Sequence, residues 1–296
     1  MKQRILITGG SGLLGQYLNL FADKENEILT LYNHHIGNCN NFNSTKVNIE
    51  NFNVLDEIFT SFKPNIVIHT AAITKPIPLP EQNPKDVYNV NVNSTIKIAK
   101  LCKQIGSKLI YISTDLVYAG YRGSMLTEDS KLIPVSLYAE TKLMGEMKIK
   151  STFDNYLILR TALLYGIGLN HSVCHFHRMV ESLKNKKQVK LFTDQFRTPI
   201  SLRETSEIIV KLSSLDIKTE IINLGGKERV SRYQLGEILC SVSGYEKSLL
   251  QKIKLDDIPE LPKVEDVSLT TKKLQSFGIK QKSIEENIKE IIHDYS

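Results

Sequence analysis

The sequence predicts an α/β protein: a doubly wound parallel sheet with helices on both faces, followed by a smaller C-terminal lobe. Over the first half of the chain, short runs rich in Ile, Val and Leu alternate with amphipathic helical patterns. The runs are apolar throughout, which is typical of parallel strands covered on both faces. In addition, a glycine-rich segment joins the first run directly to the first helical pattern.

The expected elements follow one another in regular order. Strands are expected at 4–8, 27–32, 65–70, 108–114 and 156–161. Helices are expected at 13–22, 52–62, 84–105 and 137–150. The long helix at 84–105 begins with Pro84, a residue favoured in a first helical turn, and its apolar residues recur near helical spacing.

The alternation becomes less regular after about residue 165. The pattern predicts a helix near 171–186, a strand near 188–192, a helix from Ser201 and a strand at 221–226. Capping-box sequences mark helix starts at Ser201, Ser231 and Ser283. We expect residues 1–165 to form the sheet domain, with segments around 188–225 completing it. Residues 166–296 are expected to form mainly a second, discontinuous lobe.

Composition excludes several classes of function. The net charge of +6 is spread along the chain, and the one dense basic run, LKNKKQVK at 183–190, is interpreted as a solvated helix end. We therefore expect no nucleic-acid partner. Cys39, Cys102, Cys174 and Cys240 lie far apart, so they are expected to be reduced thiols and not metal ligands. With no apolar run of membrane-spanning length, and no apolar leader before RILITGG, the sequence predicts a cytoplasmic protein without membrane contact.

The segment TGGSGLLG at 8–15 follows the first strand and opens the first helix. Its glycines permit a tight turn and let the backbone approach a pyrophosphate, while the helix N-terminus offers free N–H groups and partial positive charge. This position makes the motif a strong indication of a Rossmann-type dinucleotide site. The residues expected to contact the cofactor here are Gly9, Ser11, Gly12, Leu13, Leu14 and Gly15.

The end of the second strand bears on the choice of cofactor. An acid at this place would bind the 2′-hydroxyl of the adenosine ribose, but the chain has Tyr32, Asn33, His34 and His35. Without a carboxylate there is no repulsion against a 2′-phosphate, although no Arg is present to bind one. The sequence therefore favours NADP(H) over NAD(H) and leaves NAD(H) open.

Tyr138 and Lys142 are four residues apart on the helix expected at 137–150, so they share one helical face. Because the chain has twelve tyrosines and many lysines, the spacing alone could arise by chance. Beside a dinucleotide loop, the pair becomes a candidate for proton transfer. An ammonium near Tyr138 is expected to lower the pKa of the phenol toward the working range.

Six motifs in order make the chain resemble the extended short-chain dehydrogenase/reductase family over most of its length. They are TGGSGLLG at 8–15, HTAA at 69–72, NVNST at 91–95, ISTDLVYAG at 112–120, YAETK at 138–142 and RTALLYG at 160–166. The resemblance implies that Thr114, Tyr138 and Lys142 are catalytic: Tyr138 protonates a carbonyl oxygen, Thr114 hydrogen-bonds it, and Lys142 also holds the nicotinamide ribose. It further implies cofactor contacts at Asn33, His34, Asn48, Ile49, Thr70, Ala71, Ala72, Asn91, Tyr138 and Lys142.

Within that family, the chain is similar to the 4-keto reductases of nucleotide sugars, such as the dTDP-4-dehydrorhamnose reductases. No Glu follows Thr114-Asp115, which disfavours a dehydratase, and TDQFRTPIS at 193–201 is similar to the reductase branch. The resemblance implies an NAD(P)H-dependent reduction of a nucleotide-diphosphate 4-keto-6-deoxy sugar. Leu116 and Arg197 depart from that branch, and Arg197 is similar to the phosphate-holding Arg of epimerases. The expected substrate contacts are Asp115, Asp194, Gln195 and Arg197, with strand-end capping left open for Asp115.

Two alternatives remain on the same scaffold. One is a nucleotide-sugar epimerase, and the other is a non-catalytic regulatory subunit resembling that of methionine adenosyltransferase. The resemblance also implies a homodimer. His171 and His175 have the spacing of one helical face, with His177 close by, but no carboxylate stands at a ligand position, so no metal site is expected. Contact between one of these histidines and the sugar or nucleotide stays open.

Overall fold

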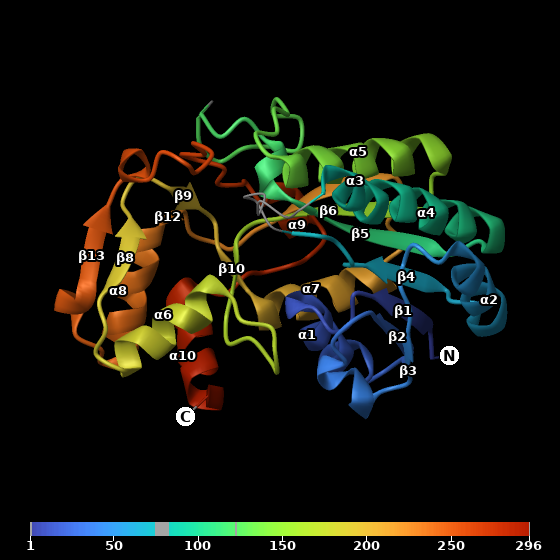
Figure 1. Ribbon diagram of the computed structural model, residues 1–296, viewed down its shortest axis with the longest axis horizontal. Helices are drawn as coiled ribbons and strands as arrows, with labels where there is room; N and C mark the ends of the chain where they lie inside the picture. Colours follow the sequence, from blue (N-terminus) through green and yellow to red (C-terminus); the bar gives the residue numbers. More distant parts are fainter. Residues whose placement is uncertain (1, 75–82, 122, 296) are drawn as a thin grey trace.

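The computed structural model describes residues 2–74, 83–121 and 123–295. Figure 1 shows a large sheet between two helical layers, with a smaller lobe beside it. The large sheet has seven strands in the order β11-β6-β5-β4-β1-β2-β3, and every neighbouring pair is parallel. Its strands are β1 (Arg4–Thr8), β2 (Glu27–Tyr32), β3 (Ser44–Lys46), β4 (Ile66–His69), β5 (Lys108–Thr114), β6 (Tyr156–Thr161) and β11 (Glu220–Leu224). The predicted doubly wound fold is confirmed.

The order of the strands places a ligand site at the centre of the sheet. The chain runs from β1 outward to β3, and then returns to the other side of β1 through β4, β5 and β6. In such a sheet, ligands bind at the carboxyl ends of the strands where the direction of winding reverses. That point lies between β1 and β4.

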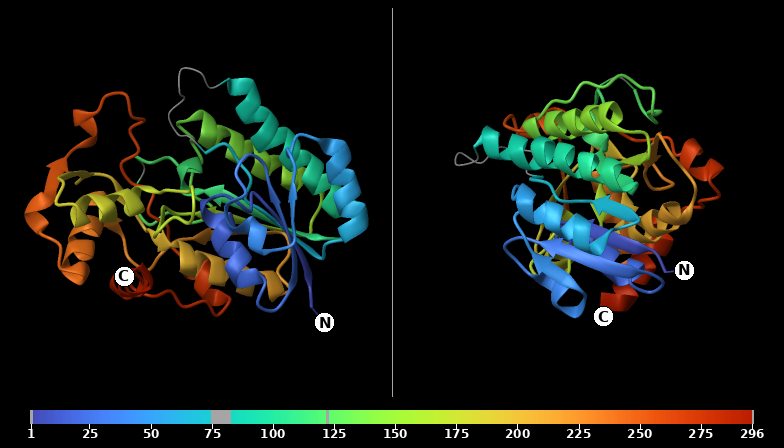
Figure 2. Two further views of the ribbon diagram at one scale, coloured as in Figure 1. Left: turned by 60° about the horizontal axis from the view of Figure 1, so that its bottom comes forward. Right: turned by 90° about the vertical axis from the view of Figure 1, so that its right-hand side faces the viewer.

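Helices cover both faces of the sheet, as Figure 1 and the right-hand view of Figure 2 show. One layer contains α1 (Leu13–Ala22) and α7 (Leu202–Ser214), and the other contains α2 (Phe52–Phe62), α4 (Ser94–Ile105) and α5 (Leu137–Thr152). Alternate residues of each strand enter the two apolar cores: Ile5 and Ile7 face α1, while Leu6 faces α2 and α4. The sheet is therefore buried on both sides, which explains the uninterrupted apolar runs.

The helix predicted at 84–105 is not uniform. It consists of α3 (Pro84–Tyr88), a π-helical turn at Asn89–Asn93, and then α4. Wide turns of this kind are often found at functional sites. Here the π turn contains Asn91, one of the expected cofactor residues.

The smaller lobe has its own apolar core. Its longer elements are α6 (His175–Lys184), β8 (Val189–Phe192), α8 (Arg232–Ser243), β13 (Leu250–Ile253) and α10 (Ile284–Tyr295). Strand β8 pairs in parallel with β13. Short elements connect the lobe to the sheet domain: β7 (Leu164–Tyr165), β9 (Phe196–Arg197), β10 (Ile200–Ser201), β12 (Val230–Ser231) and α9 (Lys272–Ser276).

The segment 188–225 is shared between the two parts: α7 packs under the large sheet and β11 extends it, whereas β8 belongs to the lobe. The capping boxes at Ser231 and Ser283 form both of their hydrogen bonds. Ser201 accepts from the Glu204 N–H, but the Glu204 carboxylate binds the Lys282 N–H instead.

The start of α6 corrects one prediction. The helix begins at His175, not near residue 171. His171 therefore lies in the loop before the helix, and the helical face expected to join His171 with His175 does not exist.

Candidate active site

A cleft of about 890 Å³ opens at the carboxyl ends of β1, β2, β4 and β5, where the sheet domain meets the start of α6. Its lining contains these predicted site residues: Gly9, Ser11, Gly12, Leu13, Leu14, Gly15, Asn33, His34, Asn48, Ile49, Thr70, Ala71, Ala72, Thr114, Asp115, Tyr138 and Lys142. Residues separated by more than a hundred positions thus converge on one space. Asn91, Asp194, Gln195 and Arg197 are not among the lining residues.

The glycine loop is shaped by close backbone contacts. Gly9 has a φ of +70°, a conformation that favours glycine. A Cβ atom on Gly15 would lie 2.1 Å from the Gly9 carbonyl oxygen, so only glycine lets α1 start this close to β1. The N-cap of α1 is Gly12, and no acidic residue occupies the first turn. The loop therefore presents free N–H groups to the cleft, which fits the pyrophosphate of a dinucleotide.

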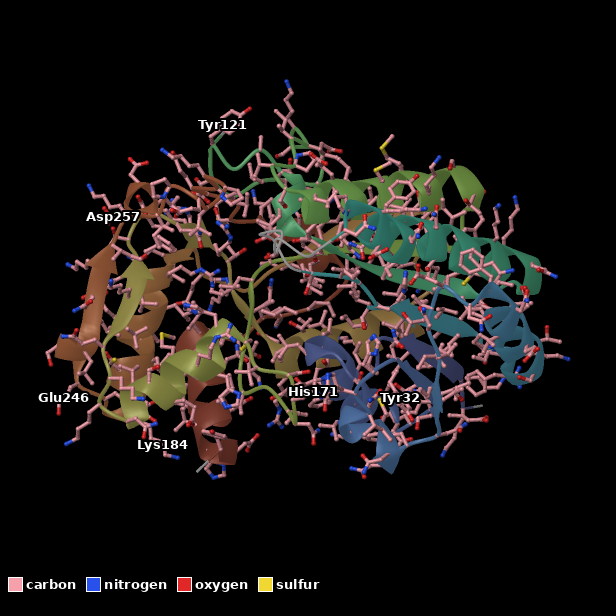
Figure 3. The ribbon with its side chains drawn as sticks, in the orientation of Figure 1. Tyr32, Tyr121, His171, Lys184, Glu246 and Asp257 are labelled. Atoms are coloured by element: carbon pink, nitrogen blue, oxygen red, sulfur yellow. The ribbon has the colours of Figure 1, made fainter. Side chains whose placement is uncertain are left out.

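The opposite wall at the end of β2 carries no carboxylate. Tyr32, Asn33, His34 and His35 line the cleft there. The His35 ring stacks against the His171 ring, with 4.5 Å between centroids and 33° between planes. Figure 3 labels Tyr32 within the sheet domain and His171 nearer the lobe, at a similar height in the view. His171 is not itself a lining residue, so the open prediction of a contact between one of the three histidines and the sugar or nucleotide is untested for it.

Thr114, Tyr138 and Lys142 line the same cleft. Thr114 ends β5, and its hydroxyl accepts from the Leu116 N–H at 3.2 Å and donates to Asp115 Oδ1 at 3.2 Å. Tyr138 stands in the first turn of α5, where Ser136 caps the helix by accepting from the Ala139 N–H. Lys142 follows one turn later and is buried, 2% exposed.

The electrostatics of the pair differ from the prediction. Burial raises the pKa of the Tyr138 phenol, the Asp115 carboxylate raises it further, and the Thr114 hydroxyl opposes both. Burial also lowers the pKa of Lys142 to about 7, against the opposite effect of Glu146. The expected lowering of the Tyr138 pKa by Lys142 is therefore not seen: burial dominates the shift, and the charge that acts on the phenol is that of Asp115.

Asn91 is fully enclosed beneath the cleft. Its side-chain oxygen accepts from the Ile73 N–H at 2.8 Å, and its amide donates to the Ile73 carbonyl and to the Thr141 hydroxyl. Ile73 lines the cleft. Asn91 therefore fixes the backbone after β4 against α5 and reaches the cleft only through that contact.

A charged cluster lies next to Thr114. The Asp115 carboxylate is 3.6 Å from Arg197 Nε, and both side chains are 6% exposed. The cluster contains a second guanidinium, that of Arg232 at the start of α8. Its Nε donates to Gln195 Oε1 at 2.9 Å. Burial first, and then repulsion from Arg197, lower the pKa of Arg232 to about 9. Arg197 is also attracted by Asp266, but that carboxylate is ion-paired with Arg229 at 2.6 Å. Three guanidiniums therefore face two carboxylates, which leaves positive charge for an anionic ligand.

Two predicted substrate residues have structural partners instead. Both Asp194 carboxylate oxygens accept from the Leu255 N–H at 3.1 Å, and Asp194 lines a separate cavity of about 520 Å³. Gln195 orients Arg232 through the bond described above. Sequence reasoning missed Arg232. The available signal was its place directly after the capping Ser231, which puts it in the first turn of a helix near the boundary of the lobe.

No group of His, Cys, Asp and Glu within the described ranges could hold a metal ion. His177 accepts from the Gly168 N–H, while burial, followed by Arg232 and Arg178, lowers the pKa of His175 to about 4. Across the same described residues, the helices are too short or too polar to cross a membrane.

Comparison with known proteins identifies the family. The family model described as RmlD substrate binding domain matches residues 2–296. Methionine adenosyltransferase 2 subunit beta of Xenopus laevis is 27% identical over 292 residues, covering 95% of this chain and 84% of that protein. The dTDP-4-dehydrorhamnose reductase of Aggregatibacter actinomycetemcomitans is 27% identical over 302 residues, covering 97% of this chain and 98% of that protein.

Solved structures agree in fold. The dTDP-4-dehydrorhamnose reductase of Bacillus anthracis, in complex with NADP, superposes with a TM-score of 0.86 at 23% identity, covering 99% of this chain and 100% of that one. The Bordetella bronchiseptica enzyme WbmG, in complex with NAD and UDP, superposes with a TM-score of 0.84 at 22% identity. The superposition covers 100% of this chain and 95% of that one. The match of the family model to residues 2–296, on a sheet of the same architecture, means that the chain belongs to the RmlD substrate-binding domain family.

Proposed function

We propose that the protein is an NAD(P)H-dependent reductase of a nucleotide-diphosphate 4-keto-6-deoxy sugar, similar to the dTDP-4-dehydrorhamnose reductases. The observation that carries the proposal is that Thr114, Tyr138 and Lys142 line the same cleft as the glycine loop. A protein that only bound a dinucleotide would have no chemical need for this combination of hydroxyl, phenol and ammonium.

The residues present fit a bound dinucleotide: glycines cradle the pyrophosphate, and the wall of Thr70, Ala71 and Ala72 leads from them toward Tyr138. When bound, the reduced nicotinamide supplies the hydride. Tyr138 then gives its proton to the oxygen of the substrate carbonyl. Its raised pKa keeps the phenol protonated until that oxygen becomes an alkoxide, a stronger base than any phenolate. Thr114 orients the same oxygen, and Lys142 stabilises the phenolate that remains.

The charged cluster around Asp115 supports a substrate that carries a pyrophosphate. Arg197 and Arg232 lie on the lobe side of Asp115, next to Thr114, where the nucleotide diphosphate attached to the sugar would extend. Guanidinium groups suit a pyrophosphate because their planar fork donates paired hydrogen bonds. Asp115 would contact the sugar. Asp194 would anchor the segment that leads to Arg197 by accepting from the Leu255 N–H, and Gln195 would hold the Arg232 side chain.

NADP(H) is proposed as the preferred cofactor. The wall formed by Asn33 and His34 at the end of β2 has no carboxylate that would repel a 2′-phosphate. The four cysteines are buried free thiols, which supports a reducing compartment such as the cytoplasm. The homodimer implied by the family remains a prediction, to be checked by light scattering of the purified protein.

The test is consumption of NADPH and of NADH with dTDP-, GDP- and UDP-linked 4-keto-6-deoxy sugars. We expect turnover by the wild type and loss of at least about a hundredfold in kcat for Tyr138→Phe, because the proton donor is removed while the ring remains. Tyr121→Phe, a change on an exposed side chain outside the cleft, is the matched control. Turnover that survives Tyr138→Phe would refute the assignment of the donor.

A second candidate is favoured by one specific observation: the Xenopus laevis relative named as a methionine adenosyltransferase subunit is as similar to this chain as the bacterial reductase is. Under this candidate the protein would bind a dinucleotide and a partner enzyme without reducing a sugar. Tight cofactor binding without turnover of any sugar, together with a stable complex with a methionine adenosyltransferase, would favour it. Sugar isomers formed without net NAD(P)H consumption would favour an epimerase.

A further inference from the structure

The loop before α6 and the turn after β2 are both hydrogen-bonded to one buried side chain, that of Gln16. Gln16 of α1 donates to the Leu169 carbonyl at 2.9 Å and accepts from Asn170 Nδ2 at 2.6 Å. The same Gln16 oxygen accepts from the Asn38 N–H at 3.0 Å, in the turn that follows β2. The position of the loop at 169–172 relative to the loop after β2 is therefore set by α1.

This arrangement places His171 next to His35, which lines the cofactor cleft, although His171 is not itself a lining residue. Ser172 donates to the carbonyl of Ser11 in the glycine loop at 3.2 Å. His171 stacks on His35, which lines the cleft together with His34. Three separate segments thus surround the place where the adenosine ribose of a dinucleotide would lie.

The charges around this place are unusual for a phosphate site. Among the described residues lining the cleft, Lys142 is the sole Lys or Arg, and it lies at the catalytic end. Glu50, after β3, also lines the cleft and would oppose a phosphate. The groups at the β2 end that can become cations are therefore His34 and His35 in the lining, and His171, which stacks on His35.

We propose that His35 and His171 together form the determinant that selects a 2′-phosphorylated adenosine ribose, and so NADP(H) over NAD(H). The inference rests on the dinucleotide site of the proposed function. Imidazolium groups from two sides would each donate a charge-assisted hydrogen bond to the phosphate. NAD(H), which has a hydroxyl at this place, would gain no such charge pairing.

The proposal predicts a pH dependence confined to NADP(H). In the free protein, burial and then the charge of His35 lower the pKa of His171, so this imidazole is mostly neutral near pH 7. A phosphate dianion favours the protonated ring, so binding should take up a proton and should strengthen as the pH falls. We expect the affinity for NADPH to fall about tenfold between about pH 6.5 and 8, while that for NADH stays nearly constant.

The experiment is titration calorimetry of the full-length protein with NADPH and NADH at both pH values, in two buffers of different ionisation heat. The variants are His171→Asn and His35→Asn, and the control is His293→Asn, on α10, whose side chain is 90% exposed. His171→Asn should weaken NADPH binding about tenfold, as for one charge-assisted hydrogen bond, and should change NADH binding less than about twofold. It should also reduce the proton uptake that accompanies NADPH binding.

Three results would overturn the inference: equal weakening of both cofactors, unchanged NADPH binding in both variants, or a wild type that binds NADH as tightly as NADPH. The proposed function fails differently. Selective, histidine-dependent NADPH binding without reduction of any sugar would support this inference and refute the reductase. A wild type that binds neither nucleotide would refute both.

Discussion

The ammonium nitrogen of Lys142 lies 3.9 Å from the centre of the Tyr111 ring. Tyr111 is fully buried in β5, and its hydroxyl donates to the Lys142 backbone carbonyl at 3.3 Å. A cation over an aromatic face gains about 0.5–2 kcal/mol, more when water is excluded. Tyr111 therefore offsets part of the cost of burying Lys142, and it fixes the position of this side chain in the cleft lining.

Gly145 makes this contact sterically possible. A Cβ atom on Gly145 would lie 2.3 Å from the Tyr111 hydroxyl oxygen and 2.9 Å from the ring carbon that bears it. Gly145→Ala should therefore destabilise the protein by about 1–3 kcal/mol through overpacking. This loss would outweigh the helix propensity gain of about 1 kcal/mol that Ala brings. Urea unfolding measures the change.

Ser151→Ala on the exposed end of the same helix is the control and should be nearly neutral. Because displacement of Tyr111 moves Lys142, Gly145→Ala should also lower kcat more than it raises the KM for the sugar. A variant as stable and active as the wild type would contradict the proposed support of Lys142.

Lys142 should set the alkaline limit of activity. Burial lowers its pKa to about 7, so the ammonium is present below that pH and is lost as the pH rises through it. The pKa of Tyr138 is raised, so the proton donor stays protonated over the same range. We expect kcat/KM in the reduction direction to fall above about pH 7, and Lys142→Arg to flatten the profile because guanidinium stays charged.

The matched control is Lys148→Arg, an exposed position on the same helix. It should leave the profile unchanged. A wild-type rate that stays constant to pH 9, or a Lys142→Arg profile with the same alkaline fall, would show that Lys142 does not titrate in the reaction.

Beneath the site, an ion pair joins α5 to β6. Arg160 Nη2 lies 2.8 Å from Glu146 Oε2, and both side chains are 2% exposed. Arg160 also donates to the Tyr118 hydroxyl at 2.8 Å. Arg160→Met leaves the Glu146 carboxylate buried without its ion-pair partner. The free energy of unfolding should therefore fall by about 3–5 kcal/mol.

Chemical denaturation compares this variant with Lys289→Met, which breaks the exposed pair with Glu285 on α10 and should cost less than about 0.5 kcal/mol. Similar small losses in both variants would mean that Glu146 becomes protonated or hydrated without Arg160. The buried pair would then contribute little.

The sequence predicted the sheet well because its signals are local. The strand predictions at β1, β2, β5 and β6 match the structure at both ends, since uninterrupted apolar runs are required wherever both faces are covered. β3 was missed because Ser44–Lys46 has three residues and no apolar run. The π turn at Asn89–Asn93 was missed because the helical spacing continues through it.

Site residues could be predicted where a local sequence motif fixes their geometry. They could not be predicted where their position depends on how the lobe packs. The glycine loop and the Tyr138/Lys142 pair line the cleft as expected, because each sits on one local element. Arg232 and His171 adjoin the lining residues Asp115 and His35, and they lie on segments whose position depends on tertiary contacts, through Gln195 and Gln16. The direction of the Tyr138 pKa shift also depends on burial, which sequence spacing does not reveal.

Arg232 should act on the sugar and not on the dinucleotide. Its guanidinium adjoins Arg197 and Asp115, and Gln195 holds its Nε. Arg232→Gln should raise the KM for the nucleotide sugar about tenfold, through loss of a charge-assisted hydrogen bond to the pyrophosphate, and should leave the Kd for NADPH unchanged. Steady-state kinetics and calorimetry separate the two effects.

The control is Arg203→Gln, on the outer surface of α7, where the side chain is 39% exposed. It should change neither the KM for the sugar nor the Kd for NADPH. An unchanged KM in Arg232→Gln, or an equal loss of NADPH affinity, would mean that the second guanidinium serves the fold of the lobe and not the substrate.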